Sequence, residues 1–127
     1  MTRHVGSLAL ALMISTTAHA QTGKLTELAR SDLAGTNMEI VVNLFEQPPG
    51  GVGALHTHPG TEVYYVIDGG TAETPDGKPI ELEPNTAQIV ERDIPHGGLK
   101  ITGNKTLKLL TIHIIDKGKP MTVLVKP

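Results

Sequence analysis

Glycine and proline interrupt this chain so often that only short regular elements can form. The 127 residues include 14 glycines and 9 prolines. The stretches between them are rich in valine, isoleucine, leucine and threonine, and helical periodicity is scarce. Short strands joined by tight turns are therefore expected, in a single all-β domain built as a sandwich or a barrel.

The expected strands follow from this punctuation and from the alternation of apolar and polar residues. They cover residues 37–45, 54–58, 61–68, 71–74, 79–83, 86–90, 99–102, 106–115 and 121–125. The Asp76-Gly77 pair lies between two of them and is typical of a hairpin turn. A β-barrel domain is thus expected over residues 37–127.

The segment before this domain divides into two parts. Residues 1–20 have a positive start at Arg3, an apolar stretch and the small residues Ala18 and Ala20, as in a secretory signal peptide. We expect cleavage after Ala20 and a secreted or periplasmic protein; a retained anchor or a buried helix is the alternative. Over residues 21–36, leucines at weakly helical spacing predict a short helix or a loose arm.

Composition excludes several classes of function. There is no cysteine, which excludes disulfides, thiolate metal ligands and cysteine nucleophiles. One phenylalanine, two tyrosines and no tryptophan are too few for a surface that stacks nucleic-acid bases. A net charge of −2 without a basic run argues against nucleic acid, and against a membrane after signal removal, as partners. A small molecule is the expected ligand.

Two histidines, His56 and His58, stand two residues apart in an expected strand. Side chains with this spacing share one face of a strand, so both imidazoles can bind one ion. Glu62 follows after a turn and can direct its carboxylate back to the same ion. His96, from a distant turn and strand, would complete a set of three imidazoles and one carboxylate.

This spacing resembles the first motif of the cupin family, G-x5-H-x-H-x3-E-x6-G. The residues that match every fixed position of it are Gly50, His56, His58, Glu62 and Gly69. The second cupin motif, G-x5-P-x-G-x2-H-x3-N, retains only His96. Its other fixed positions are occupied by Asn85, Glu91, Asp93 and Lys100. The resemblance covers roughly residues 37–115.

The resemblance implies a jelly-roll barrel that holds one divalent transition metal near one mouth, with His56, His58, Glu62 and His96 as ligands. Imidazole and carboxylate suit Mn, Fe, Ni, Cu or Zn, and ligand type does not choose among them. Metal-bound cupins include dioxygenases, decarboxylases, isomerases and lyases. A dioxygenase-like enzyme is the favoured function by this analogy. The alternative is a module that captures a small ligand or a metal without turning it over.

Two further residues are candidates for a catalytic role beside Glu62, which could exchange protons as well as bind the metal. Tyr64 shares the strand face of Glu62 and is either a pocket group or a core residue with a satisfied hydroxyl. His113 is either a cavity group or an ordinary histidine of the sheet, hydrogen-bonded or exposed. Gln88 could also face the pocket. Arg92, beside a turn, is the nearest candidate for a cation that would bind an acidic substrate.

A homodimer is also expected. Cupins often dimerise through sheet edges, and the sequence offers two segments that could cover or pair with an open edge, residues 25–33 and 121–125.

Overall fold

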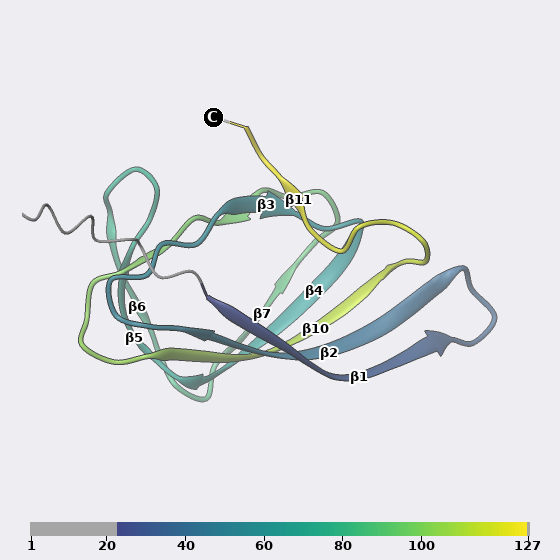
Figure 1. Ribbon diagram of the computed structural model, residues 1–127, viewed down its shortest axis with the longest axis horizontal. Coiled ribbons are helices and arrows are strands. Elements are labelled where there is room, and N and C mark those ends of the chain that lie inside the picture. Colours follow the sequence, from purple (N-terminus) through teal and green to yellow (C-terminus); the bar gives the residue numbers. More distant parts are fainter. Residues whose placement is uncertain (1–22, 127) are drawn as a thin grey trace, which may run out of the picture.

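The computed structural model describes residues 23–126 and consists of strands and turns throughout that range (Figure 1). The signal peptide expected over residues 1–20 lies outside the described part. Between residues 23 and 126 no helix is long and apolar enough to cross a membrane. The prediction of an all-β fold is confirmed.

Eleven strands form within residues 23–126. They are β1 (Lys24–Leu33), β2 (Met38–Gln47), β3 (Leu55–Thr57), β4 (Gly60–Asp68), β5 (Gly70–Glu73), β6 (Pro79–Leu82), β7 (Ala87–Val90), β8 (His96–Gly97), β9 (Lys100–Ile101), β10 (Leu107–Asp116) and β11 (Val123–Leu124). Each stretch predicted as a strand overlaps one of them. Only β1 and β8 form where the sequence predicts none.

One antiparallel sheet of five strands, in the order β1-β2-β10-β4-β7, forms one side of the barrel. Two sheets of three strands, β11-β3-β8 and β6-β5-β9, complete it. Figure 1 shows β3 and β11 across from the five-stranded sheet. Strands distant in sequence lie side by side, because β10 enters the sheet between β2 and β4. This is the predicted jelly-roll barrel.

The short helix or loose arm expected before the barrel is wrong for its described part. Residues Lys24–Leu33 are instead strand β1, which pairs with β2 along its length and has one irregularity between Glu27 and Ala29. Leu25 and Leu28 are 47% and 56% exposed, so their helical spacing does not mark a buried face. The reason is that the open edge of β2 offers backbone hydrogen bonds, which outweigh a weak local helix preference.

The interior is divided along β10 into an apolar and a polar zone. Leu107 belongs to a buried apolar cluster against which Leu109 packs. Further along the same face, Thr111 and His113 are 4% and 3% exposed. Period-two alternation turns all four side chains inward. The polar side chains of this face thus lie at one end of β10 and the apolar ones at the other.

Candidate metal centre

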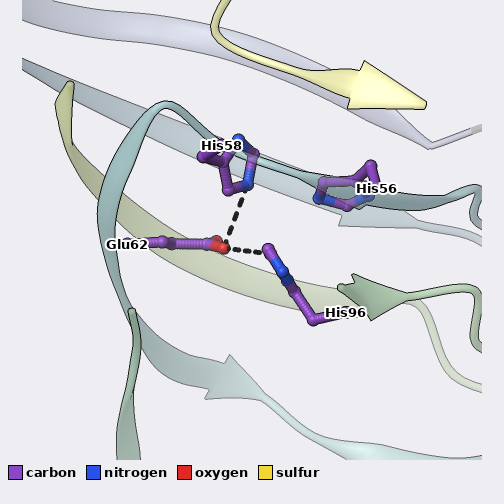
Figure 2. Close-up of side chains that lie close together, drawn as sticks. All are labelled: His56, His58, Glu62 and His96. Carbon is purple, nitrogen blue, oxygen red and sulfur yellow. Dashed lines mark hydrogen bonds and ion pairs between the residues drawn. The ribbon is translucent and has the colours of Figure 1, made fainter. Parts of the chain in front are cut away.

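Four side chains of the polar zone converge on one point. They form the ligand tetrad, namely His56, His58, Glu62 and His96, and one nitrogen or oxygen atom from each lies within 4.8 Å of the others. Figure 2 shows the three rings and the carboxylate directed towards one another. Opposite ligands of one ion at 2.0–2.1 Å lie about 4 Å apart. The tetrad therefore surrounds a space of about the size of a single ion.

The pairing of β3 with β8 and the close approach of β4 to β10 at Gly60 bring the tetrad residues together. Strands β3 and β8 are antiparallel neighbours, with His56 directly opposite His96. His58 follows β3, and the chain then turns into β4 at Gly60. A Cβ at Gly60 would lie 1.9 Å from the carbonyl oxygen of Ile114 on β10. Only glycine lets β4 begin this close to β10, and Glu62 is placed as a result.

His96 takes its place although the sequence around it departs from the second cupin motif. The next residue, Gly97, has a φ of 80°, which favours glycine. A Cβ there would lie 2.8 Å from Cε1 of His56. The absence of a side chain thus permits β8 to approach β3, and this pairing positions the His96 ring beside the His56 ring.

Hydrogen bonds to the backbone fix which nitrogen of each ligand ring faces the centre. In all three rings Nδ1 bonds to a carbonyl oxygen. The pairs are His56 with Ala54 at 2.8 Å, His58 with Met121 at 2.6 Å and His96 with Ile94 at 2.8 Å. A carbonyl oxygen only accepts, so each Nδ1 carries a hydrogen atom and donates it. In the neutral ring, Nε2 then has the lone pair that a metal requires.

The Nε2 atom of His58 shows that this arrangement fits a cation. It is buried and has no hydrogen-bond partner among residues 23–126. Oε2 of Glu62 lies 3.2 Å away, but without the angles of a hydrogen bond. A buried nitrogen that lacks a partner is costly. The remaining donors are imidazole nitrogens and a carboxylate, a set that suits a divalent transition metal.

The charge on the tetrad is set by Glu62. Burial alone would raise the pKa of this carboxyl, but the imidazoles of His58 and His96 hold it well below its usual range. Nε2 of His96 lies 2.7 Å from Oε2 of Glu62, and this hydrogen bond raises the pKa of His96. In the absence of a metal, the protonated Nε2 of His96 therefore donates to the Glu62 carboxylate. A bound cation would take the place of that proton.

His113 lies beside the tetrad in the opposite tautomer. The amide nitrogen of Asn43 donates to Nδ1 of His113 at 3.3 Å, so in the neutral ring Nε2 carries the hydrogen atom. Nε2 lies 3.7 Å from Oε1 of Glu62, which is too far for a hydrogen bond. Burial lowers the pKa of His113 to about 4. The structure thus places a neutral His113 beside Glu62, and its Nε2 keeps no lone pair for an ion.

Tyr64 and Gln88, both weighed from the sequence, lie together in the same cavity. The Tyr64 hydroxyl donates to Oε1 of Gln88 at 2.6 Å. Burial and the charge of Glu62 raise the pKa of Tyr64, so the phenol keeps its proton. Tyr65 points out of the barrel and is 39% exposed, as the alternation predicts. Tyr64 is therefore a pocket group whose hydroxyl is also satisfied.

The cavity has a volume of about 520 Å³ and extends from the tetrad into the apolar zone. Its lining includes Phe45, Val90, Leu99 and Leu109, and it contains no lysine or arginine among the described residues. Arg92, considered above as a substrate-binding cation, instead makes two bonds to Asp116, at 2.8 and 2.9 Å. Among the lining residues within 23–126, Glu62 is the one carboxylate.

Three contributors to this site are not identified by the sequence reasoning. Asn43 sits amid the apolar residues of β2, and a polar residue on the inward face is a signal that could have revealed it. Thr111 shares the face of His113, which is a similar signal. Met121 acts through its backbone carbonyl, which no side-chain pattern reveals.

Comparison with known proteins gives one family match. Residues 43–113 match the family described as the cupin domain. This stretch contains the whole ligand tetrad and His113. No functionally curated protein matches the sequence.

Several solved structures share the fold. A cupin domain protein from Bordetella pertussis has a TM-score of 0.58 and 18% identity, over 76% of this chain and 96% of that one. The polyketide cyclase RemF from Streptomyces resistomycificus has a TM-score of 0.54 and 26% identity, over 72% of this chain and 65% of the cyclase. The DMSP lyase DddQ from Ruegeria pomeroyi has a TM-score of 0.54 and 19% identity, over 69% of this chain and 44% of the lyase.

Proposed function

This chain belongs to the cupin family, and from that premise we propose that it is a metal-dependent enzyme that acts on a small molecule at the ligand tetrad. The cofactor would be one divalent transition metal, chosen among Mn, Fe, Ni, Cu and Zn. The observation that carries the proposal is the common tautomer of three rings, whose Nδ1 atoms all donate to backbone carbonyls. Each Nε2 atom therefore faces the same point as the Glu62 carboxylate.

Within this class we favour a dioxygenase-like oxidation. When bound, the metal would polarise a substrate oxygen or bring dioxygen next to it. An apolar cavity beside the tetrad supports this choice, because dioxygen is itself apolar. The further support is family analogy, and the similar folds include a cyclase and a lyase. Fold alone does not select the reaction.

The residues of this chain would divide the remaining tasks. Glu62 supplies the negative charge and stays ionised. His113 is a neutral ring beside the carboxylate, with Nε2 3.7 Å from Oε1 of Glu62. Tyr64 keeps its proton and holds the Gln88 side chain at the cavity wall. Apolar side chains exclude water from the substrate body, which strengthens every polar contact at the centre.

A non-catalytic binding module is the alternative. An enzyme is expected to have a proton-transfer group in the cavity besides the metal ligands, whereas a binder needs none. His113 and Tyr64 both line the cavity and neither belongs to the tetrad. Their presence favours the enzyme.

The metal site is tested by elemental analysis of purified protein. We expect one metal ion per chain, and its loss in His58→Ala and His96→Ala. Thr57→Ala is a matched control, because Thr57 lies between two tetrad residues and its side chain points to the other face of β3. Wild-type protein without stoichiometric metal, or His58→Ala protein that keeps it, would contradict the proposal.

Turnover is tested with an oxygen electrode. Protein loaded in turn with Fe²⁺, Mn²⁺, Ni²⁺, Cu²⁺ or Zn²⁺ is mixed with neutral aromatic diols and ketones. We expect dioxygen uptake with a redox-active metal, and none with Zn²⁺ or with His58→Ala. Product formed without dioxygen uptake would exclude the dioxygenase. Ligand binding with neither uptake nor product would support the binding module.

We also propose that the protein is exported and cleaved after Ala20, on the sequence pattern described above. N-terminal sequencing of protein recovered outside the cytoplasm tests this. A mature chain that begins at Gln21 is expected, and an intact Met1 would contradict the proposal.

A further inference from the structure

We infer that the cavity binds a small molecule with one oxygen-bearing head at the tetrad and an elongated, uncharged body in the apolar zone. The inference rests on the proposed function for the metal-bound head. The body is argued from side chains that the metal centre does not use.

The first observation is the charge of the lining. The described residues around the cavity include no lysine or arginine, and Arg92 is committed to Asp116. A divalent ion beside the Glu62 carboxylate leaves one net positive charge, enough to balance a single ionised group on the head. A second ionised group further along the ligand would be buried without a partner, which is strongly unfavourable.

The second observation is a polar atom next to the tetrad. Thr111 is 4% exposed, and its hydroxyl has no hydrogen-bond partner among residues 23–126. It lines the cavity and stands opposite Tyr64, one inward position along β10 from His113. A hydroxyl or carbonyl on the ligand, adjacent to the metal-binding atom, would satisfy it.

The third observation sets the length of the body. Gln47 is 2% exposed, and neither atom of its side-chain amide has a partner within the described range. It lines the same cavity and stands opposite Leu107, whereas Thr111 stands opposite Asn43. Leu107 and Thr111 are four residues apart on β10, which corresponds to about 13 Å at the rise of an antiparallel strand. The far end of the ligand body would therefore lie beside the neutral amide of Gln47.

The side chains between these two polar groups are apolar. Phe45 and Leu109 face each other across β2 and β10, and both line the cavity. Leu107 continues the same wall. Each methylene buried here contributes about 0.8 kcal/mol, or roughly fourfold in affinity. Affinity should therefore rise with the length of an alkyl body.

Three hydroxamic acids with the same metal-binding head test the inference. Octanohydroxamic acid has a methyl terminus, suberic acid monohydroxamate replaces that methyl with a carboxylate, and suberic acid monoamide monohydroxamate replaces it with a neutral amide. Dissociation constants are measured by calorimetry on Zn²⁺-loaded wild-type protein. We expect the methyl and amide probes to bind at least about tenfold more tightly than the carboxylate probe. Acetohydroxamic acid, which is almost all head, should bind more weakly than octanohydroxamic acid.

The variant Gln47→Leu checks the far end of the cavity. It removes the buried amide and keeps a similar volume, so folding is expected to be retained. The amide probe should lose affinity relative to the methyl probe, and discrimination against the carboxylate probe should remain. An unchanged ratio of amide to methyl affinity would exclude Gln47 as the end of the body site.

Repeating the titrations on EDTA-treated protein separates this inference from the proposed function. All affinities should fall, because the heads lose the metal, but the preference for an uncharged terminus should persist. Equal affinities for the three termini, or tighter binding of the carboxylate probe, would overturn the inference. A preserved preference with no effect of metal on any affinity would contradict the metal site and leave the apolar body site standing.

Discussion

At the scale of single residues, the partner of Nδ1 separates His113 from the three rings of the tetrad. Those three donate from Nδ1 to a carbonyl, whereas His113 accepts there from Asn43. All four rings are close; the centroids of His58 and His113 are 4.4 Å apart. Proximity alone would therefore not distinguish a ligand from a neighbour. The hydrogen-bond partner does, since it decides which nitrogen keeps a lone pair.

Burial of neutral His113 predicts a pH dependence of stability. Its pKa is about 4 in the folded protein against 6.5 for an unperturbed histidine. Between pH 6.5 and pH 4, His113 binds a proton in the unfolded chain but not in the folded chain. The free energy of unfolding therefore falls as the pH drops from 6.5 towards 4. The full contribution is roughly 3 kcal/mol. Urea denaturation of metal-free protein at stepped pH measures it.

The matched variant for this measurement is His113→Gln. A glutamine can accept from Asn43, as the neutral ring does, but it does not titrate. The variant should show a shallower loss of stability over the same pH interval. Identical slopes in the two proteins would show that His113 is not the group responsible.

At the scale of elements, the segment that contains Met121 and β11 orients one ring of the tetrad from far along the chain. Strand β11 pairs with β3, and the preceding Met121 carbonyl accepts from Nδ1 of His58. A chain that ends at Pro120 should bind metal about 10- to 100-fold more weakly, because the His58 ring loses its orientation. Competition with a chromophoric chelator measures the affinity. A chain that ends at Val125 is the control and should match wild type.

The turn between β3 and β4 gives a second prediction at this scale. In Gly60→Ala the new Cβ would meet the Ile114 carbonyl of the neighbouring strand at 1.9 Å, and backbone cannot yield as a side chain can. We expect a loss of about 3 kcal/mol or more in the free energy of unfolding. Gly53→Ala is the comparison, because the nearest atom to its Cβ lies at 3.7 Å. Similar midpoints of thermal unfolding for the two variants would contradict the expectation.

The strands show what local pattern can and cannot predict. Alternation in residues 106–115 is strong and correctly predicts strand β10 and which of its residues share a face. Strand β1 is not predictable in the same way, since most of its residues are exposed and its pairing depends on the free edge of β2. The spacing of His56, His58 and Glu62 predicts three members of the tetrad, and the alignment of His96 with the second cupin motif predicts the fourth. The Met121 contact does not, because it joins a ring to a backbone atom far away in the sequence.

At the scale of the whole molecule, the outer face of the five-stranded sheet is apolar. Val42, Ile112, Val63 and Ile89 are consecutive partners across β2, β10, β4 and β7, and their side chains point away from the cavity. Ile89 is 70% exposed. Continuous apolar surface of this kind is typical of interaction sites. The expected homodimer stays a prediction, and this face is a better candidate for it than the sheet edges.

Light scattering coupled to size-exclusion chromatography tests the dimer. We expect twice the mass of the chain for wild type, and a shift towards monomer in Ile89→Lys. This position is exposed, so the substitution should leave the folded monomer intact. Ile94→Lys is the control, because Ile94 is 52% exposed but lies in the loop after β7. A monomeric wild type, or equal effects of both variants, would remove this face as the interface.

The Met121 contact also bears on when the centre can load. Met121 lies 63 residues downstream of His58. During synthesis His56, His58 and Glu62 leave the ribosome well before the carbonyl that orients the second of these rings. A nascent chain would thus display three donors in the right order but without a fixed direction. The metal proposed above would therefore be selected only after residue 121 has joined the folded barrel.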